Sequence, residues 1–197
     1  MAEDAVDEAI ETFNLKPKAG ITFNDISGSG AAGITTTGKC ITRDVPLIGA
    51  HGFSPELAGH LMDVHKIDQD IASHLASNYG DRAWAVLRAA KSPANRLLPK
   101  LPFIEAEVRH AVHYEAAVTA TDVIARRMRL SFLDVNESLK ALKQVIAIMA
   151  EELDWSEKRR RQEFNDSVGF LRSMGLSEAT ASESLGLPAG GLLKSTE

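Results

Sequence analysis

From residue 54 onwards, apolar residues recur at helical spacing through most of the chain. The clearest pattern lies at 139–153, where the intervals between apolar positions alternate between three and four residues, as in the seam of a helical bundle. Other segments with helical periodicity or helix start and stop signals are 54–64, 68–79, 81–87, 104–112, 119–129 and 156–174. The pattern therefore predicts an all-α fold, a bundle of about six to seven helices.

Terminal signals support two of these helices. Thr119 and Asp122 have the three-residue spacing of a capping box, which indicates a helix that buries Ile124 and Met128. Gly175 lies just past the last helix, where Leu176 is expected to fold back on the end of that helix. Residues 177–197 are small, polar and rich in glycine, so we expect a flexible tail there.

Residues 1–15 predict a separate N-terminal helix. Val6, Ile10 and Phe13 recur at helical spacing, and the first eleven residues carry five acids and no base. No side chain suited to an N-cap precedes the helix, and no following helix is close enough in sequence to cover its apolar stripe. We interpret it as an orphan helix of a larger protein. The acidic start also lacks the features of a targeting signal.

Residues 16–50 change to a composition rich in glycine and threonine, which is typical of a linker. A strand-like piece at 40–48 contains Pro46 and would be restricted to a sheet edge. Gly28–Gly33 matches the GxGxxG string of dinucleotide-binding folds, but the β-branched run at 34–37 follows it instead of a helix. A nucleotide site is therefore not expected here.

Composition and charge exclude further classes of protein. The chain has 197 residues, 44% of them apolar, and a formal net charge of -5, so it has a core but no overall basic field for nucleic acid. Cys40 is the single cysteine and cannot close an intrachain disulfide. The longest apolar stretch, near 145–150, is far shorter than the roughly 20 residues that span a bilayer, so no transmembrane segment is expected.

Two side-chain groups are candidates for chemistry. His110 and His113 form an HxxH pair near Glu107 and Glu115, the kind of cluster that can ligate a metal. We interpret them as two exposed histidines on a solvated face and expect no metal site. No Ser-His-Asp or Cys-His arrangement is recognisable, so no catalytic or cofactor-binding residue is expected on this chain either.

Basic residues cluster at 158–161 and at Arg126, Arg127 and Arg129. Such clusters can form a phosphate-binding surface for nucleic acid. Acids flank the first cluster, however, and Asp122 is placed to pair with Arg126 four residues on, so a solvated or interdomain face is favoured. A second expected pair of this spacing joins Glu105 to Arg109.

Five strings in order along the chain resemble one family. They read HGF at 51–53, LASNYGDRA at 75–83, PFIEAEVRHAV at 102–112, TDVIARRMRLSFL at 121–133 and IMAEELDWS at 148–156. They resemble the C-terminal helical domain of FAD-dependent, quinone-linked glycerol-3-phosphate dehydrogenase of the mitochondrial type. The resemblance covers residues 1–176 apart from an insert near 21–37. His110, His113 and Met128 depart from the family's usual Tyr, Arg and Thr.

The resemblance implies a role within a larger enzyme that oxidises sn-glycerol 3-phosphate to dihydroxyacetone phosphate and reduces a quinone at the mitochondrial inner membrane. FAD would belong to the parent enzyme, with none bound by this chain alone. Residues 1–15 would be the last helix of the FAD-binding domain, and residues 51–176 the C-terminal cap, whose partner is that domain. We expect Glu105, Arg109, Arg126 and Arg127 to make the interdomain contact, and an uncovered apolar surface to cause self-association.

Two other functions remain open at this point. The chain can be a stand-alone, non-catalytic helical module that docks on another protein. A helical nucleic-acid binder that uses the arginine clusters is the weakest alternative. An anionic lipid contact through the basic residues is also compatible with an enzyme that works at a membrane.

Overall fold

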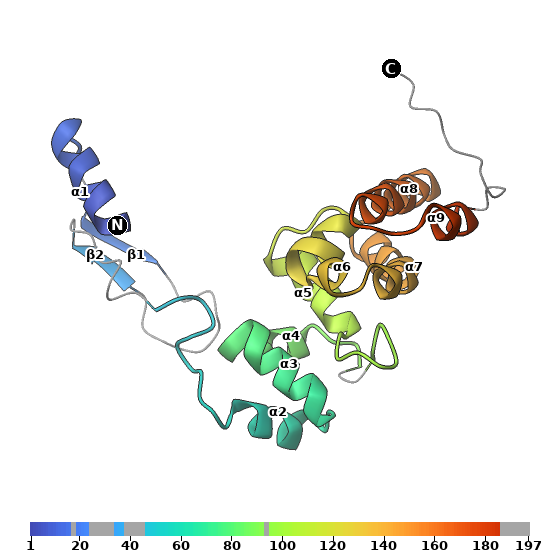
Figure 1. Cartoon of the computed structure of the whole chain (residues 1–197). Coiled ribbons are helices and arrows are strands. Elements are labelled where there is room, and N and C mark those ends of the chain that lie inside the picture. The colour runs from blue at the N-terminus through green and yellow to red at the C-terminus, as the bar shows by residue number, and fades with distance from the viewer. Residues whose placement is uncertain (17–18, 24–33, 38–45, 93–94, 186–197) are drawn as a thin grey trace. The chain divides into compact units, whose positions relative to one another are not determined.

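The computed structural model describes residues 1–16, 19–23, 34–37, 46–92 and 95–185. Helices dominate these residues, which confirms the all-α prediction, and one small two-stranded sheet accompanies them (Figure 1). The chain divides into two compact units, Met1–Ala85 and Val86–Glu197.

The first unit begins with helix α1, Ala2–Thr12, in which no residue is buried. Strands β1, Ala19–Phe23, and β2, Ile34–Thr37, pair antiparallel, with Thr22 opposite Thr35. The run of isoleucine and threonines in β2 favours a strand because β-branched side chains fit a pleated surface. The strand expected at 40–48 is absent from its described part, residues 46–48, and its remainder lies outside the described residues.

Helices α2, Leu57–His65, and α3, Gln69–Tyr79, follow in the first unit. They pack through buried leucine and isoleucine side chains, of which Leu61, Ile71 and Leu75 are fully buried. A short 3-10 turn, η1, covers Gly80–Arg82, and helix α4 covers Ala83–Arg88. As predicted, α3 ends at Tyr79, because Gly80 adopts a positive φ of 57° that breaks the helical path.

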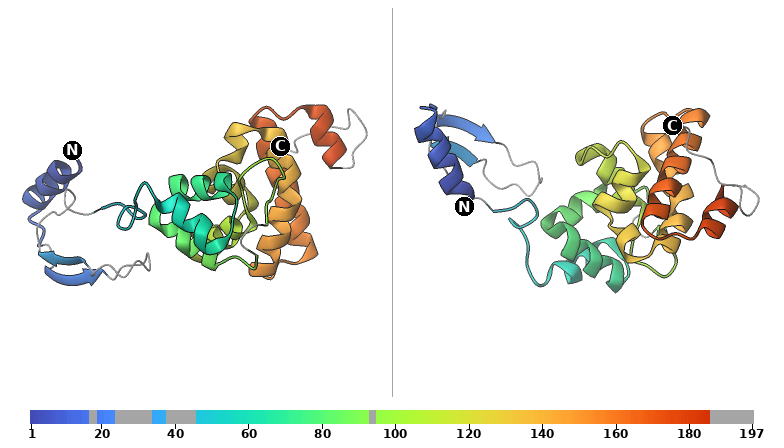
Figure 2. Two further views of the ribbon diagram at one scale, coloured as in Figure 1. Left: turned by 90° about the horizontal axis from the view of Figure 1, so that it is seen from below. Right: turned by 45° about the horizontal axis from the view of Figure 1, so that its top comes forward.

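The second unit is a helical bundle. Its elements are α5, Glu105–Tyr114; the π-helical turn η2, Asp122–Arg127; α6, Leu130–Leu133; α7, Val135–Glu152; α8, Glu157–Ser173; and α9, Glu178–Ser184. Helix α7 lies beside α8 in each view (Figure 2). The predicted seam is confirmed, because Leu142, Ile146 and Met149 of α7 all lie in one buried cluster with residues of α5, η2 and α8.

Capping follows the sequence signals closely. The backbone N–H of Asp122 donates to Thr119 Oγ1 at 3.1 Å, and the N–H of Thr119 donates to the Asp122 carboxylate at 2.9 Å, which confirms the capping box. At the end of α8, Gly175 has φ 106° and the N–H of Leu176 donates to the carbonyl of Leu171 at 2.9 Å. This Schellman motif buries Leu176 as expected.

Two segments of the second unit differ from the prediction. The helix expected at 119–129 is a π-helical turn, and Arg129 breaks it with φ 58° before α6 begins. The segment expected to be a tail begins instead with α9, whose N-terminus is capped by Ser177 through a 3.1 Å bond from the Thr180 N–H. Ala181 joins the core, so one buried alanine anchors a helix whose composition gave no apolar pattern. Residues 186–197 lie outside the described residues.

Candidate functional site

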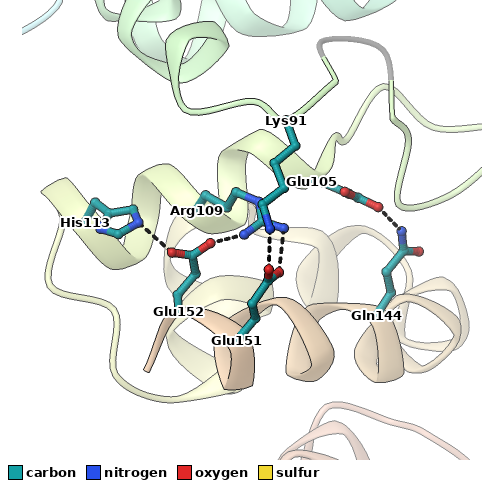
Figure 3. A network of polar contacts seen from close by, with 7 residues as sticks. All are labelled: Lys91, Glu105, Arg109, His113, Gln144, Glu151 and Glu152. Carbon is teal, nitrogen blue, oxygen red and sulfur yellow. Dashed lines mark hydrogen bonds and ion pairs between the residues drawn. The ribbon is translucent and has the colours of Figure 1, made fainter. Parts of the chain in front are cut away.

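A network of charged side chains links α5 to the end of α7 (Figure 3). Arg109 of α5 is buried, and its guanidinium donates to Glu151 at 3.0 Å and also to Glu152. His113, one turn further along α5, contacts the other oxygen of Glu152 at 2.8 Å. Lys91 pairs with Glu151 from the loop before α5. Two neighbouring carboxylates of α7 therefore hold three basic groups.

The predicted pair between Glu105 and Arg109 is wrong. Glu105 instead accepts a hydrogen bond of 2.8 Å from the side-chain amide of Gln144, which lies on α7 (Figure 3). Arg109 turns to the carboxylates at the end of the same helix. The prediction weighed only residues four apart on one helix, whereas α7 packs along α5 and supplies closer partners. Both residues thus fasten α5 to α7.

The electrostatics of this network keep Glu151 charged. Its pKa is lowered, first by the hydrogen bond from Lys91 and then by the bond from Arg109, with the positive charges of both adding to the effect. The Glu151 side chain is about half exposed, so solvent screens this ion pair. The network therefore consists of ion pairs and hydrogen bonds that attach α5 to α7.

The HxxH pair is divided by the structure. His110 is fully buried, contrary to the expectation that both histidines are exposed, and its ring lies 5.0 Å from that of Tyr114. His113 is half-exposed and faces Glu152. His110 Nε2 also lies 3.9 Å from the Glu115 carboxylate, and the burial of its ring is a tertiary effect that the HxxH spacing does not encode. Among the described residues, no group of three or more His, Cys, Asp or Glu side chains is arranged to hold a metal ion.

The predicted contact residues Arg126 and Arg127 lie on η2 and face solvent. Arg126 pairs with Asp122, as predicted from their spacing, and its side chain is 72% exposed. Arg127 pairs with Glu115, with 2.6 Å between Nε and the carboxylate. Burial raises the pKa of Asp122, but hydrogen bonds from Val118, Thr119 and Arg126 outweigh this and lower it. The structure thus leaves Arg126 and Arg127 at the surface and encloses Arg109.

Two carboxylates are buried that the sequence did not predict to be so: Glu107, considered only as a neighbour of the HxxH pair, and Glu163, assigned to a solvated or interdomain face. Glu107 accepts a 2.8 Å hydrogen bond from the N–H of Ile104 at the start of α5. Glu163 accepts one of 2.8 Å from the N–H of Ala120 and pairs with Arg159 at 2.6 Å. The spacing of Glu107 from the helix start was a recognisable capping signal. No pattern in the sequence around Glu163 indicates its hydrogen bond with Ala120.

The first unit contains a tight backbone junction between two of the family-like strings. The N–H of Asp81 donates to the carbonyl of Gly49 at 2.9 Å, and the Asp81 carboxylate accepts from the N–H of Gly52 at the same distance. A Cβ on Gly49 would lie 2.7 Å from the carbonyl oxygen of Tyr79. The segment around 49–53 is thereby held against the end of α3 by close backbone contact at Gly49 and by the carboxylate of Asp81.

No FAD site is evident among the described residues. The phosphates of a dinucleotide bind where a parallel strand leads into a helix N-terminus. In the described ranges, the two strands pair antiparallel and belong to one hairpin. The GxGxxG string at 28–33 lies outside the described residues. In the same described ranges, no helix is long and apolar enough to cross a bilayer.

Comparison with protein-family models identifies a family for this chain. Residues 40–160 match the model described as the C-terminal domain of alpha-glycerophosphate oxidase. The matched region spans the junction at Gly80, the network around Arg109 and the turn that carries Arg126. No solved structure matches the chain significantly.

Similar curated proteins come from distant organisms. The chain is 42% identical over 143 residues to a probable mitochondrial glycerol-3-phosphate dehydrogenase of Dictyostelium discoideum, which covers 72% of this chain and 22% of that protein. It is 36% identical over 178 residues to the mitochondrial glycerol-3-phosphate dehydrogenase of Mesocricetus auratus, covering 87% of this chain and 22% of the relative. The Arabidopsis thaliana mitochondrial protein is 33% identical over 189 residues, covering 88% and 27%. The chain thus spans about a fifth to a quarter of these relatives.

Proposed function

Because this chain belongs to the family of the C-terminal domain of alpha-glycerophosphate oxidase, we propose that it serves as the C-terminal helical domain of an FAD-dependent glycerol-3-phosphate dehydrogenase. The enzyme would oxidise sn-glycerol 3-phosphate to dihydroxyacetone phosphate and pass the electrons to a quinone. The match of 87% of the chain to a named dehydrogenase carries this proposal. The names of the relatives support a mitochondrial location. A parent enzyme that reduces a quinone would work at the inner membrane, and this location is part of the proposal.

In this proposal the chain contributes no reacting group. The flavin would be held by a separate FAD-binding domain of the same enzyme, where it would accept the hydride of the substrate. This chain would dock on that domain through the face that Arg126 and Arg127 present. Arg109 and Glu105 would contribute indirectly. They attach α5 to α7 and so hold the docking face in place.

We expect the isolated chain to retain no flavin and to show no dehydrogenase activity. The reason is that FAD and substrate would be bound by the partner domain. The measurement is the absorbance spectrum after desalting from excess FAD, together with dye reduction dependent on glycerol 3-phosphate. Stoichiometric flavin or substrate-dependent reduction in the isolated chain would contradict the proposal that it lacks the flavin domain.

The role as a domain of the enzyme is tested in a chimera. We propose to replace the matching segment of the Dictyostelium dehydrogenase with residues 46–176 of this chain. The chimera should reduce the dye with glycerol 3-phosphate, whereas a stand-alone interaction module would leave it inactive. Double substitution Arg126→Glu and Arg127→Glu should lower kcat or flavin retention at least about tenfold, because two charges at the docking face are reversed.

The matched control reverses two exposed charges elsewhere, Lys100→Glu and Lys158→Glu. It should leave the activity of the chimera unchanged. Both double variants should keep the thermal unfolding midpoint of the isolated chain within a few degrees, since exposed ion pairs contribute only about 0–1 kcal/mol each. Equal activity of the two double variants would remove Arg126 and Arg127 from the interdomain contact.

A further inference from the structure

The second unit carries a solvent-open groove that the proposed function does not use. A hollow of about 630 Å³ lies among α7, α8 and α9, and an adjoining hollow of about 370 Å³ continues along α7 and α8. The two share Lys143 and Phe164 in their walls. Apolar side chains form part of both walls; they are Leu139, Ile146, Phe164 and Leu185.

The rim of this groove is cationic. Four bases and one acid line it: Lys140, Lys143, Arg160, Arg161 and Glu183. Lys140 and Arg160 have partners, Glu137 and Glu157, outside the groove. In the part of the chain that the structure describes, Lys143 and Arg161 make no ion pair. With Glu183 and these two partner acids counted against the four bases, the groove keeps one net positive charge beside its apolar floor.

Helix α1 has the complementary character. It carries five acids and no Lys, Arg or His, and its apolar stripe is uncovered, with Val6 48% and Phe13 72% exposed. On a helix with 3.6 residues per turn, Glu3 and Asp7 lie along one side of the stripe formed by Val6, Ile10 and Phe13. An acidic edge beside an apolar row is complementary to a cationic groove with an apolar floor.

The floor of the groove offers apolar side chains for this stripe. Leu139, Phe164 and Leu185 are only partly buried, so part of each side chain is open to contact, whereas Ile146 is 6% exposed and belongs to the core. Burying the stripe would remove Val6 and Phe13 from water, where exposed apolar patches favour association.

We propose that the groove lined by α7, α8 and α9 binds helix α1 of a second copy of the chain. The contact is of the helix-in-groove type, in which apolar anchors supply affinity and the charged rim supplies selectivity. It goes beyond the role of the chain as an enzyme domain, because it concerns a surface that Arg126 and Arg127 do not reach. Salt should weaken this contact through screening of its charges.

The first test measures self-association of the full chain by sedimentation velocity over a wide range of concentration. Phe13→Glu should weaken association at least about tenfold, because it places a charge in the apolar row. Its matched control is Phe132→Glu, which changes an equally exposed phenylalanine, 63% exposed on α6, and should associate like the parent chain. Equal weakening by both variants would overturn the proposal.

The second test reverses the charges on both sides. Lys143→Glu with Arg161→Glu should abolish association, and so should Glu3→Lys with Asp7→Lys, because in each double variant the charges that face each other across the contact have the same sign. A mixture of the two double variants should associate again, since the basic helix of one meets the acidic groove of the other. Lys158→Glu, an exposed change on α8 outside the groove, should have no effect.

Two results would overturn the proposal. One is a parent chain that stays monomeric at all concentrations with α1 protected from hydrogen exchange, which would mean that α1 docks within its own chain. The other is a mixture of the double variants that fails to associate although both keep the circular dichroism and unfolding midpoint of the parent. Association that persists in the Phe13→Glu variant would place the contact on another surface.

Discussion

Gly80→Ala is expected to destabilise the first unit by about 3 kcal/mol or more. Gly80 has φ 57° and ψ -137°, a conformation that is essentially open only to glycine and costs other residues about 1–3 kcal/mol. A Cβ there would also overlap the carbonyl group of Gly49, which is backbone and cannot turn aside. Relief of the overlap would separate the chain at 49–52 from Asp81 and break two hydrogen bonds.

The measurement is urea unfolding followed by circular dichroism, compared with Gly59→Ala as the matched control. Gly59 lies exposed in α2, where an added Cβ meets nothing within 4 Å. That substitution should stabilise the unit by about 0.5–1 kcal/mol, because alanine favours a helix over glycine by this amount. Similar unfolding midpoints for the two variants would show that the junction at Gly80 contributes nothing to stability.

The helices of the second unit were predictable because their signals are local. A seam of apolar residues, an acid three positions after a threonine and a glycine before Leu176 each specify a structure within one or two turns of chain. The helix α9 was missed because its anchor is the single buried Ala181, which leaves no periodic pattern in the sequence. The π-helical turn at Asp122–Arg127 was missed because its flanking signals are those of an ordinary helix.

The ion pairs of the candidate site divide in the same way: a pair within one helical turn was predictable from the sequence, and a pair between distant segments was not. The contact between Asp122 and Arg126 lies within one turn and was predicted from spacing alone. Arg109 pairs with two carboxylates more than forty residues away in sequence, and that pairing depends on how α5 packs against α7. Side-chain burial is likewise a tertiary property, so the exposure predicted for His110 was wrong while the helix that carries it was right.

Substitution of Glu163 measures most directly how much such a long-range contact contributes to the free energy of unfolding. Its carboxylate is buried, with the side chain 4% exposed, and it accepts the N–H of Ala120 at 2.8 Å just before η2. Arg159 balances its charge from the previous turn of α8. Because Arg159 is partly exposed, the arginine can turn to solvent when Glu163 is replaced, but the N–H of Ala120 is buried and cannot.

We therefore expect Glu163→Leu to lower the free energy of unfolding by about 2–4 kcal/mol, of which the orphaned Ala120 N–H accounts for about 1–3 kcal/mol. Glu163→Gln keeps an oxygen for that N–H and loses only the charge, so it should cost about 1 kcal/mol. Glu157→Gln, which removes an exposed acid paired with Arg160, is the control and should change stability by less than about 0.5 kcal/mol.

Urea unfolding of the three variants separates the two contributions of Glu163. A large gap between the leucine and glutamine variants assigns the stability to the hydrogen bond with Ala120, which joins α8 to the chain that leads into η2. If both variants lose the same amount, the charge pair with Arg159 carries it instead. If neither differs from Glu157→Gln, burial of this carboxylate is neutral, and the attachment of η2 rests on its apolar contacts with the core.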